Sequence, residues 1–183
     1  MIKRAPIVAV AGMVALLALS AGIAVGQGDD GTAAKALLHD AGGALVGVAK
    51  LTESDGAVRV RVEVEGLPAG FHGFHVHAIG VCTPPFTSAG GHFNPGGAGH
   101  PGHAGDMPVL LVNRDGSAEA RFATDRYGVA DVLGRALIVH LNPDNYANIP
   151  LRYAAGGPDA TTLATGDAGG RIACGVIERG NGD

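Results

Sequence analysis

The sequence predicts a single all-β domain with many turns. The chain has 183 residues, of which 31 are glycine, and only 4% are aromatic, a composition typical of turns and close backbone approaches rather than helices. This length allows one domain with its own core and a short appendage. The clearest strand signal lies at residues 58–65, where four valines alternate with four charged residues, as in a strand with one buried face.

Other short segments with strand character recur along the chain, and turns such as Asp55-Gly56 and Asp115-Gly116 separate several of them. Repeated short strands favour an antiparallel sandwich or barrel over alternating strands and helices. We expect strands at 44–51, 58–65, 71–77, 108–113, 118–123, 136–140 and 171–177. Residues 78–107 and 141–170 are rich in glycine and proline, and loops of that length in a compact domain usually have a function.

The N-terminal 26 residues read as an export segment. Lys3 and Arg4 precede a mostly apolar stretch at 7–25, which indicates a signal peptide or, as the alternative, an uncleaved membrane anchor. Either one places the domain outside the cytosol. Residues 27–41 are polar and Gly-rich and predict a flexible tether. The domain itself should then span 42–179 and leave 180–183 as a disordered tail.

Charge and cysteine content limit which cellular compartment and which binding partners are expected for this chain. The formal net charge is −4 and no run is rich in Lys and Arg, so the chain lacks the electrostatic footprint of a nucleic-acid-binding protein. Cys82 and Cys174 are the only cysteines. In an exported chain we expect them to form a disulfide, with two buried thiols as the alternative. The sequence does not indicate an oligomeric state.

Several histidines lie on or beside predicted strands. His75 and His77 flank one residue of the segment at 71–77, so both rings should project from the same face, close enough to ligate one ion. His140 closes the apolar run at 136–140. Taken singly, each of these histidines could be solvent-facing or structural, and only the whole set favours a metal site.

The first long loop adds further donors. His92 is followed by His100, His103 and Asp106, which form a His-x-x-His-x-x-Asp run with glycines and a proline around it. Such residues let a loop fold back so that its side chains converge. Imidazole nitrogen and carboxylate oxygen suit zinc, while a solvated His-rich loop is the alternative for this segment alone.

Four motifs stand in order over about a hundred residues: Gly-Phe-His-Val-His at 73–77, Ser-Ala-Gly-Gly-His-Phe-Asn-Pro at 88–95, Gly-Arg-Ala-Leu-Ile-Val-His at 134–140 and Thr-Gly-Asp-Ala-Gly-Gly-Arg-Ile-Ala-Cys-Gly-Val-Ile at 165–177. Together they resemble the copper/zinc superoxide dismutases, and the resemblance covers residues 42–178. It implies an eight-stranded Greek-key β-barrel of immunoglobulin-like sandwich architecture, with two long functional loops.

Carried over by position, the resemblance implies two ligand sets that share one histidine. Copper would be held by His75, His77, His92 and His140, and a structural zinc by His92, His100, His103 and Asp106. The ring of His92 would give one nitrogen to each metal. His72 and His39 are expected to ligate neither.

Two further residues have roles that the resemblance implies. Arg171 would lie near the copper and attract the superoxide anion, because a guanidinium keeps its charge at any working pH. Asp144 matches an aspartate that hydrogen-bonds one histidine of each set, and carboxylates in that position fix the orientation of the rings.

The implied function is that of a superoxide dismutase, which converts superoxide to dioxygen and hydrogen peroxide while copper cycles between Cu(II) and Cu(I). His92 would take up a proton and deliver it to the peroxide. Two alternatives stay open: an exported copper or zinc carrier without turnover, and an adhesion domain with incidental histidines. Arg171 argues against the carrier, since a storage site needs no cation beside another cation. Superoxide is the expected partner, together with a membrane if the N-terminal segment is an anchor.

Overall fold

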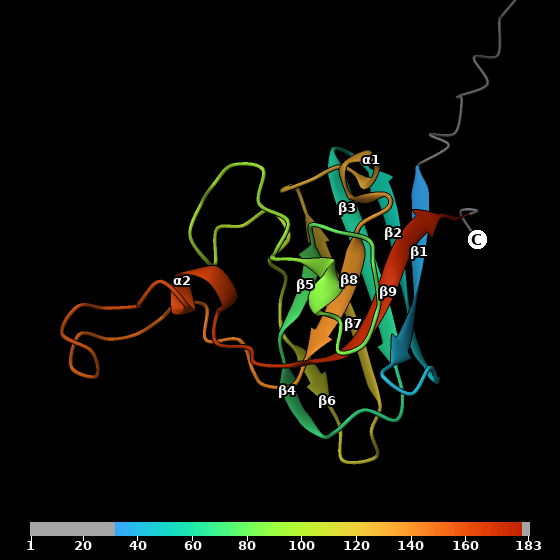
Figure 1. Ribbon diagram of the computed structural model, residues 1–183. Coiled ribbons are helices and arrows are strands. Elements are labelled where there is room, and N and C mark those ends of the chain that lie inside the picture. Colours follow the sequence, from blue (N-terminus) through green and yellow to red (C-terminus); the bar gives the residue numbers. More distant parts are fainter. Residues whose placement is uncertain (1–31, 181–183) are drawn as a thin grey trace, which may run out of the picture.

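The computed structural model describes residues 32–180 and confirms an all-β fold (Figure 1). The strands in this part of the chain are β1 (Ala33–Asp40), β2 (Leu45–Ser54), β3 (Ala57–Val64), β4 (Gly70–His72), β5 (Phe74–His77), β6 (Leu110–Val112), β7 (Ala118–Thr124), β8 (Ala136–His140) and β9 (Arg171–Arg179). Two four-residue helices, α1 (Val129–Val132) and α2 (Thr162–Thr165), and a 3-10 turn at Thr87–Ala89 complete the described elements.

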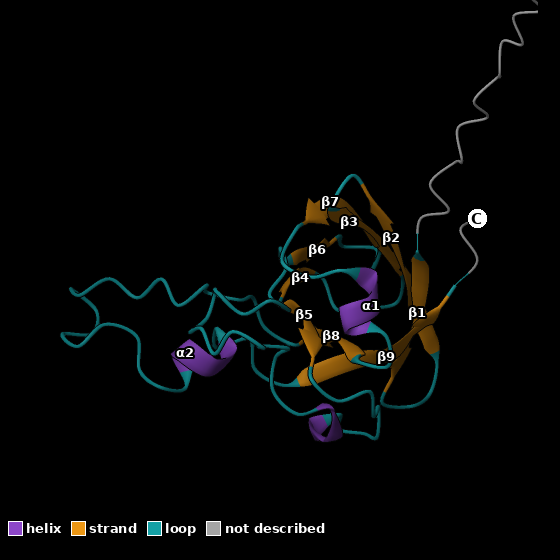
Figure 2. Cartoon of the chain, turned by 90° about the horizontal axis from the view of Figure 1, so that it is seen from above, coloured by secondary structure: helices purple, strands orange, loops and turns teal. Residues whose placement is uncertain are grey.

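Seven strands form one antiparallel sheet in the order β5-β8-β9-β1-β2-β3-β7, and β4 pairs with β6 in a second sheet. The large sheet curls, so that β4 and β6 lie between its two ends and the strands surround a common interior (Figure 2). β4 and β5 are separated only by Gly73, and if they are counted as one strand the total is eight. The pairings of β5 with β8, β1 with β9 and β3 with β7 are consistent with Greek-key connections.

The core fills the inside of the curled sheet. The alternation at 58–65 becomes β3, whose valines are buried while the charged residues between them are exposed. Phe74 and Val76 of β5 are also fully buried in this core. The alternate residues of β5, His75 and His77, lie opposite Ile138 and Ala136 of β8. Directly paired residues of antiparallel strands project from the same face. β5 therefore presents its histidines on the outer wall of the barrel.

The first long loop covers part of that outer wall. Phe86 and Ala89 pack on Ala136 and Ile138 of β8, beside the Cys82–Cys174 disulfide. The disulfide, with a Cα–Cα distance of 5.6 Å, attaches the loop to β9 and confirms the predicted pairing. The second long loop projects from the barrel and carries α2 (Figure 1).

The predicted strand at 71–77 is interrupted at Gly73, where the second long loop crosses it. The Gly73 N–H donates to the carbonyl of Asn142, and its own carbonyl accepts from the N–H of His140, both at 2.8 Å. A Cβ on Gly73 would lie 2.7 Å from the Cβ of Ala168, closer than real side chains approach. Glycine at this position therefore allows the second loop to lie directly against β5.

The predicted flexible tether is wrong for residues 33–40, which form β1 between β9 and β2 in the middle of the sheet. Ala34, Ala36 and Leu38 point into the core and are nearly inaccessible to solvent. Alanine has weak strand preference, so the alternation in this segment is a weak strand signal. The domain therefore includes residues 33–40. Gly180, the first residue of the expected tail, donates its N–H to the carbonyl of Ala33.

The expected export segment at 1–26, the first part of the tether at 27–31 and the tail residues 181–183 lie outside the described residues. Between residues 32 and 180, no helix combines the length and the apolar character needed to cross a membrane.

Replacing both cysteines, Cys82→Ala with Cys174→Ala, should lower the free energy of unfolding by about 4 to 5 kcal/mol, because the bridge closes a loop with a sequence separation of 92 and restricts the unfolded chain. Urea unfolding of the metal-free proteins measures the difference. Reductant should leave the free energy of unfolding of the double variant unchanged, and it should lower that of the wild type to the same value. Equal stabilities of wild type and variant would contradict this expectation.

Candidate metal centre

Three buried histidines on the outer wall direct one ring nitrogen each toward a common point. His77 Nδ1 donates to the carbonyl of Gly90 at 2.9 Å, and His140 Nδ1 lies 3.2 Å from the carbonyl of Gly169. Their Nε2 atoms are 3.2 Å apart. The ring of His75 donates from Nε2 to the carboxylate of Asp144, which leaves its Nδ1 to face the same point. Each ring thus has one nitrogen bonded to the protein and the other available for a metal.

His92 joins this group because the loop pairs with the open edge of β5. The Phe93 N–H donates to the carbonyl of Val76 at 2.8 Å, and the N–H of Val76 donates to the carbonyl of Gly105 at 2.9 Å. These bonds place His92 opposite His77 and Asp106 opposite His75. Candidate donor atoms of His75, His77, His92 and His140 all lie within 4.8 Å of one another, so the structure brings the four predicted residues together.

A second group lies on the other side of His92. Donor atoms of His92, His100, His103 and Asp106 are also within 4.8 Å of one another. The N–H at His92 Nδ1 donates to Asp106 Oδ1 at 2.8 Å, and Asp106 Oδ2 accepts from the backbone N–H of His103 at 3.0 Å. The use of Nδ1 here leaves His92 Nε2 for the first group, so one ring belongs to both.

The carboxylate of Asp144 connects the two groups. Its Oδ2 accepts from His75 Nε2 at 2.6 Å and its Oδ1 accepts from His100 Nε2 at 2.7 Å. Oδ1 also accepts the backbone N–H of Tyr146 at 2.7 Å. A Cβ on Gly166 would stand 2.2 Å from Asp144 Oδ1, so the second loop can approach this carboxylate only through a glycine.

Burial keeps three histidines of the first group, His75, His77 and His140, neutral at pH 7. It lowers the pKa of His75 to about 4, that of His77 to about 2 and that of His140 to about 3. After burial, repulsion from the positive charge of Arg171 also contributes to the low pKa values of His77 and His140. Neutral imidazoles have the free lone pair that a metal requires.

The second group is charged in the absence of a metal. Burial alone would lower the pKa of His100, but the nearby carboxylates of Asp106 and Asp144, whose oxygens lie 3.0 Å and 2.7 Å from its two ring nitrogens, outweigh burial and raise the value to about 9. Burial likewise opposes ionisation of the two carboxyl groups, yet close contacts with His100 and with one further histidine each hold their pKa well below the usual range. Without metal, His100 therefore carries a proton between two carboxylates, and it must lose that proton to bind a cation.

Two orphaned nitrogens show that the residues fit metal ions. Among the buried side-chain nitrogens and oxygens of residues 32–180, only His75 Nδ1 and His100 Nδ1 lack a hydrogen-bond partner. The latter lies 3.0 Å from Asp106 Oδ2, but without hydrogen-bond geometry. One orphan falls in each group. An unpaired buried nitrogen is costly unless it serves as a ligand. An all-imidazole set suits copper or zinc, and a set with a carboxylate suits zinc.

Arg171 lies at the edge of the first group. Its guanidinium donates from Nη1 to the carbonyl of Phe86 and from Nη2 to the carbonyl of Gly90. The Gly90 carbonyl also accepts from His77, so one backbone oxygen links the cation to a candidate ligand. Burial lowers the pKa of Arg171, and the side chain remains partly exposed.

The remaining two histidines, His72 and His39, lie outside both groups. His72 is buried, with Nδ1 2.7 Å from the carbonyl of His140, and His39 lies on β1. Sequence reasoning missed the contributions of the Gly90 carbonyl and of Tyr146. The position of Tyr146 two residues after an aspartate is a signal for the observed turn, whereas nothing in the sequence marks the carbonyl of Gly90.

Comparison with known proteins agrees with this geometry. The family model for copper/zinc superoxide dismutase matches residues 45–177. A Cu-Zn superoxide dismutase of Mycolicibacterium paratuberculosis is 42% identical over 161 residues, which cover 75% of this chain and 70% of the relative. One from Deinococcus radiodurans is 34% identical over 183 residues, with 88% and 91% covered.

Two solved structures have a similar fold. The Cu/Zn superoxide dismutase of Brucella abortus superposes with a TM-score of 0.66 at 33% identity, over 80% of this chain and 99% of the other. The clock protein EA4 gives a TM-score of 0.68 at 30% identity, over 82% and 96% of the respective chains. From the family match and the identity to these relatives, we conclude that the chain belongs to the copper/zinc superoxide dismutase family.

Proposed function

We propose that the protein is an exported superoxide dismutase, which converts two superoxide anions and two protons to dioxygen and hydrogen peroxide. The observation that carries the proposal is the pair of buried donor groups that share His92. Beyond His92, the first group consists of three neutral imidazoles, and the second contains an ionised carboxylate. A cation, Arg171, lies beside the first group. Family membership supports the same activity.

In this proposal copper is held by His75, His77, His92 and His140, and zinc by His92, His100, His103 and Asp106. Copper, when bound, supplies the one-electron chemistry, since it can accept an electron from one superoxide and give it to the next. The chain keeps the four copper donors in place through bonds to the other nitrogen of each ring. Asp144 holds one ring of each set and so fixes which nitrogen faces the metal.

Arg171 and His92 would act on the substrate and the product. The guanidinium of Arg171 attracts superoxide electrostatically and donates a hydrogen bond to it. His92 Nε2, on the copper side of the shared ring, is the atom that would hand a proton to the peroxide. The zinc side would keep this ring in position while Nε2 is protonated.

Export is supported by the disulfide between Cys82 and Cys174, because disulfides persist in oxidising compartments. The proposal includes a cleaved signal peptide at residues 1–26, with an uncleaved anchor as the alternative. Mass spectrometry of the mature protein's N-terminus would distinguish the two.

Protein reconstituted with both ions should contain one copper and one zinc per chain and should consume superoxide only when copper is present. Metal content by mass spectrometry and pulse-radiolysis decay of superoxide measure the two properties. Full metal loading without superoxide consumption would indicate the carrier instead. Failure to retain either metal would contradict both functions.

The Asp144→Asn variant should fold but bind at least one of the two metals about 10- to 100-fold more weakly. The amide presents N–H groups where one ring needs an acceptor, so either His75 or His100 loses its partner. Competition with a chelator measures both affinities. Asp115→Asn, in the exposed turn before β7, is the matched control. Equal copper and zinc affinities in the two variants would contradict the role proposed for Asp144.

Zinc binding by the copper-free protein should release about one proton at pH 7 and almost none at pH 10. The reason is the raised pKa of His100, about 9: below that value the ring must lose its proton to bind, and zinc affinity should rise with pH until the pKa is passed. Calorimetry in buffers of different ionisation enthalpy measures the released protons. The absence of proton release at pH 7 would show that His100 is neutral in the metal-free site.

A further inference from the structure

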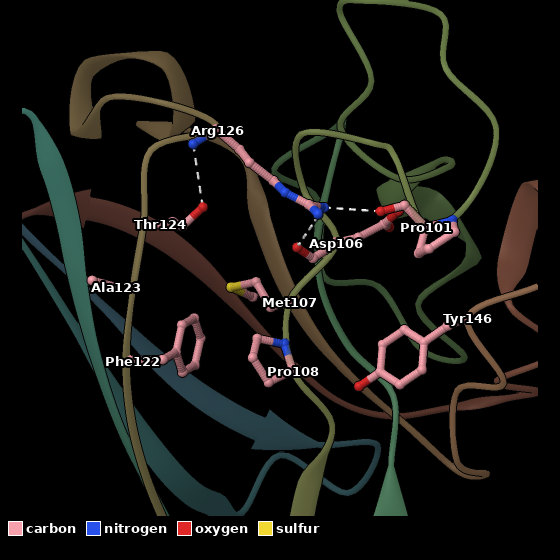
Figure 3. A pocket seen from close by; sticks show the side chains of 9 residues that line it. All are labelled: Pro101, Asp106, Met107, Pro108, Phe122, Ala123, Thr124, Arg126 and Tyr146. Atoms are coloured by element: carbon pink, nitrogen blue, oxygen red, sulfur yellow. Dashed lines mark hydrogen bonds between the residues drawn. The ribbon is translucent and has the colours of Figure 1, made fainter.

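Arg126 joins the loop of the second donor group to the barrel. It follows β7, and its side chain extends across a pocket of about 350 Å³ toward Pro101 and Asp106 (Figure 3). Nη1 donates to the carbonyl of Pro101 at 2.9 Å and to that of His103 at 3.2 Å, with the carbonyl of Asp106 at 3.5 Å. Three carbonyls of one loop thus converge on one guanidinium nitrogen.

These carbonyls belong to the segment that carries three of the four proposed zinc ligands. Two of them are the backbone oxygens of His103 and Asp106 themselves, and Pro101 follows His100 directly. A guanidinium offers several rigid donors and a permanent charge, and hydrogen bonds to a charged donor are about twice as strong as neutral ones. Arg126 therefore holds the backbone at His103 and Asp106 and at Pro101, the residue directly after His100.

The opposite side of the loop is held by different contacts. On the β5 side, the N–H of Gly105 donates to the carbonyl of Phe93, and the carbonyl of Gly105 accepts from the N–H of Val76. The N–H of His100 donates to the carbonyl of Leu163 in α2. From the β7 side, Arg126 bonds residues 101–106, and Tyr127 donates its hydroxyl to the sulfur of Met107 at 3.4 Å. On that side the pocket is lined by Met107, Pro108 and Phe122, whose side chains offer the loop no hydrogen bond from a charged group.

We propose that Arg126 is a positioning residue for zinc: it holds the backbone of residues 101–106 so that His100, His103 and Asp106 converge before the ion binds. The inference rests on the zinc ligands assigned under the proposed function. It adds a residue that touches neither metal nor substrate. Because the copper ligands lie on other segments apart from the shared His92, the effect should be selective for zinc.

The test compares Arg126→Gln and Arg126→Lys with Arg121→Gln, a control on β7 whose arginine pairs with exposed Glu119. Zinc and copper affinities are measured separately by chelator competition, and the visible spectrum of the cobalt-substituted zinc site reports ligand geometry. We expect zinc affinity to fall about 10- to 100-fold in Arg126→Gln, with an altered cobalt spectrum and unchanged copper affinity. Arg126→Lys, which keeps a cation and donors, should recover part of the loss.

Unchanged zinc affinity in Arg126→Gln would overturn the inference. So would an equal loss for copper and zinc in both Arg126 variants, which would indicate a general role in folding, and so would an equal loss of zinc affinity in the Arg121 control. In each of these cases wild-type dismutase activity would still support the proposed function. That function fails separately, if wild-type protein loaded with copper and zinc does not consume superoxide.

Discussion

The two hydrogen bonds that the Asp144 carboxylate accepts from His75 and His100 hold the whole site in its arrangement. The carboxylate reaches His75 at 2.6 Å and His100 at 2.7 Å, and these two rings come from a barrel strand and from a loop 25 residues further along the chain. One ionised group thus sets the ring orientation in two donor groups at once. Its own ionisation is favoured by the same two hydrogen bonds, so the carboxylate and the rings stabilise one another.

The fold provides the surfaces that make this contact possible. β5 has the core on one side and the long loops on the other, which explains why all of its residues are buried although two are histidines. Its open edge pairs with the first loop, and Gly73 and Gly166 let the second loop approach β5 and Asp144 closely. Arg126 acts from the β7 side of the barrel. The donor groups are therefore built by loops packed against a rigid wall.

Much of the fold could be predicted because valine alternates with charge in β3 and because turn residues separate the strands. β1 was missed, since alanine buries too little surface to give a strong pattern. The candidate donors were predictable from the His-x-His pair, the loop histidines and the family motifs. The backbone oxygens of Gly90 and of residues 101–106 were not, because any residue supplies a carbonyl and only the folded chain shows where it points.

In the proposed centre, His92 lies between two different metals. Crystals of the protein loaded with both ions, measured by anomalous diffraction at the copper and the zinc absorption edges, test it most directly. We predict two separate peaks, the copper peak beside His75, His77 and His140, the zinc peak beside His100, His103 and Asp106, and the ring of His92 between them. A single shared peak, or a copper peak away from these rings, would show that His92 does not join a copper site to a zinc site.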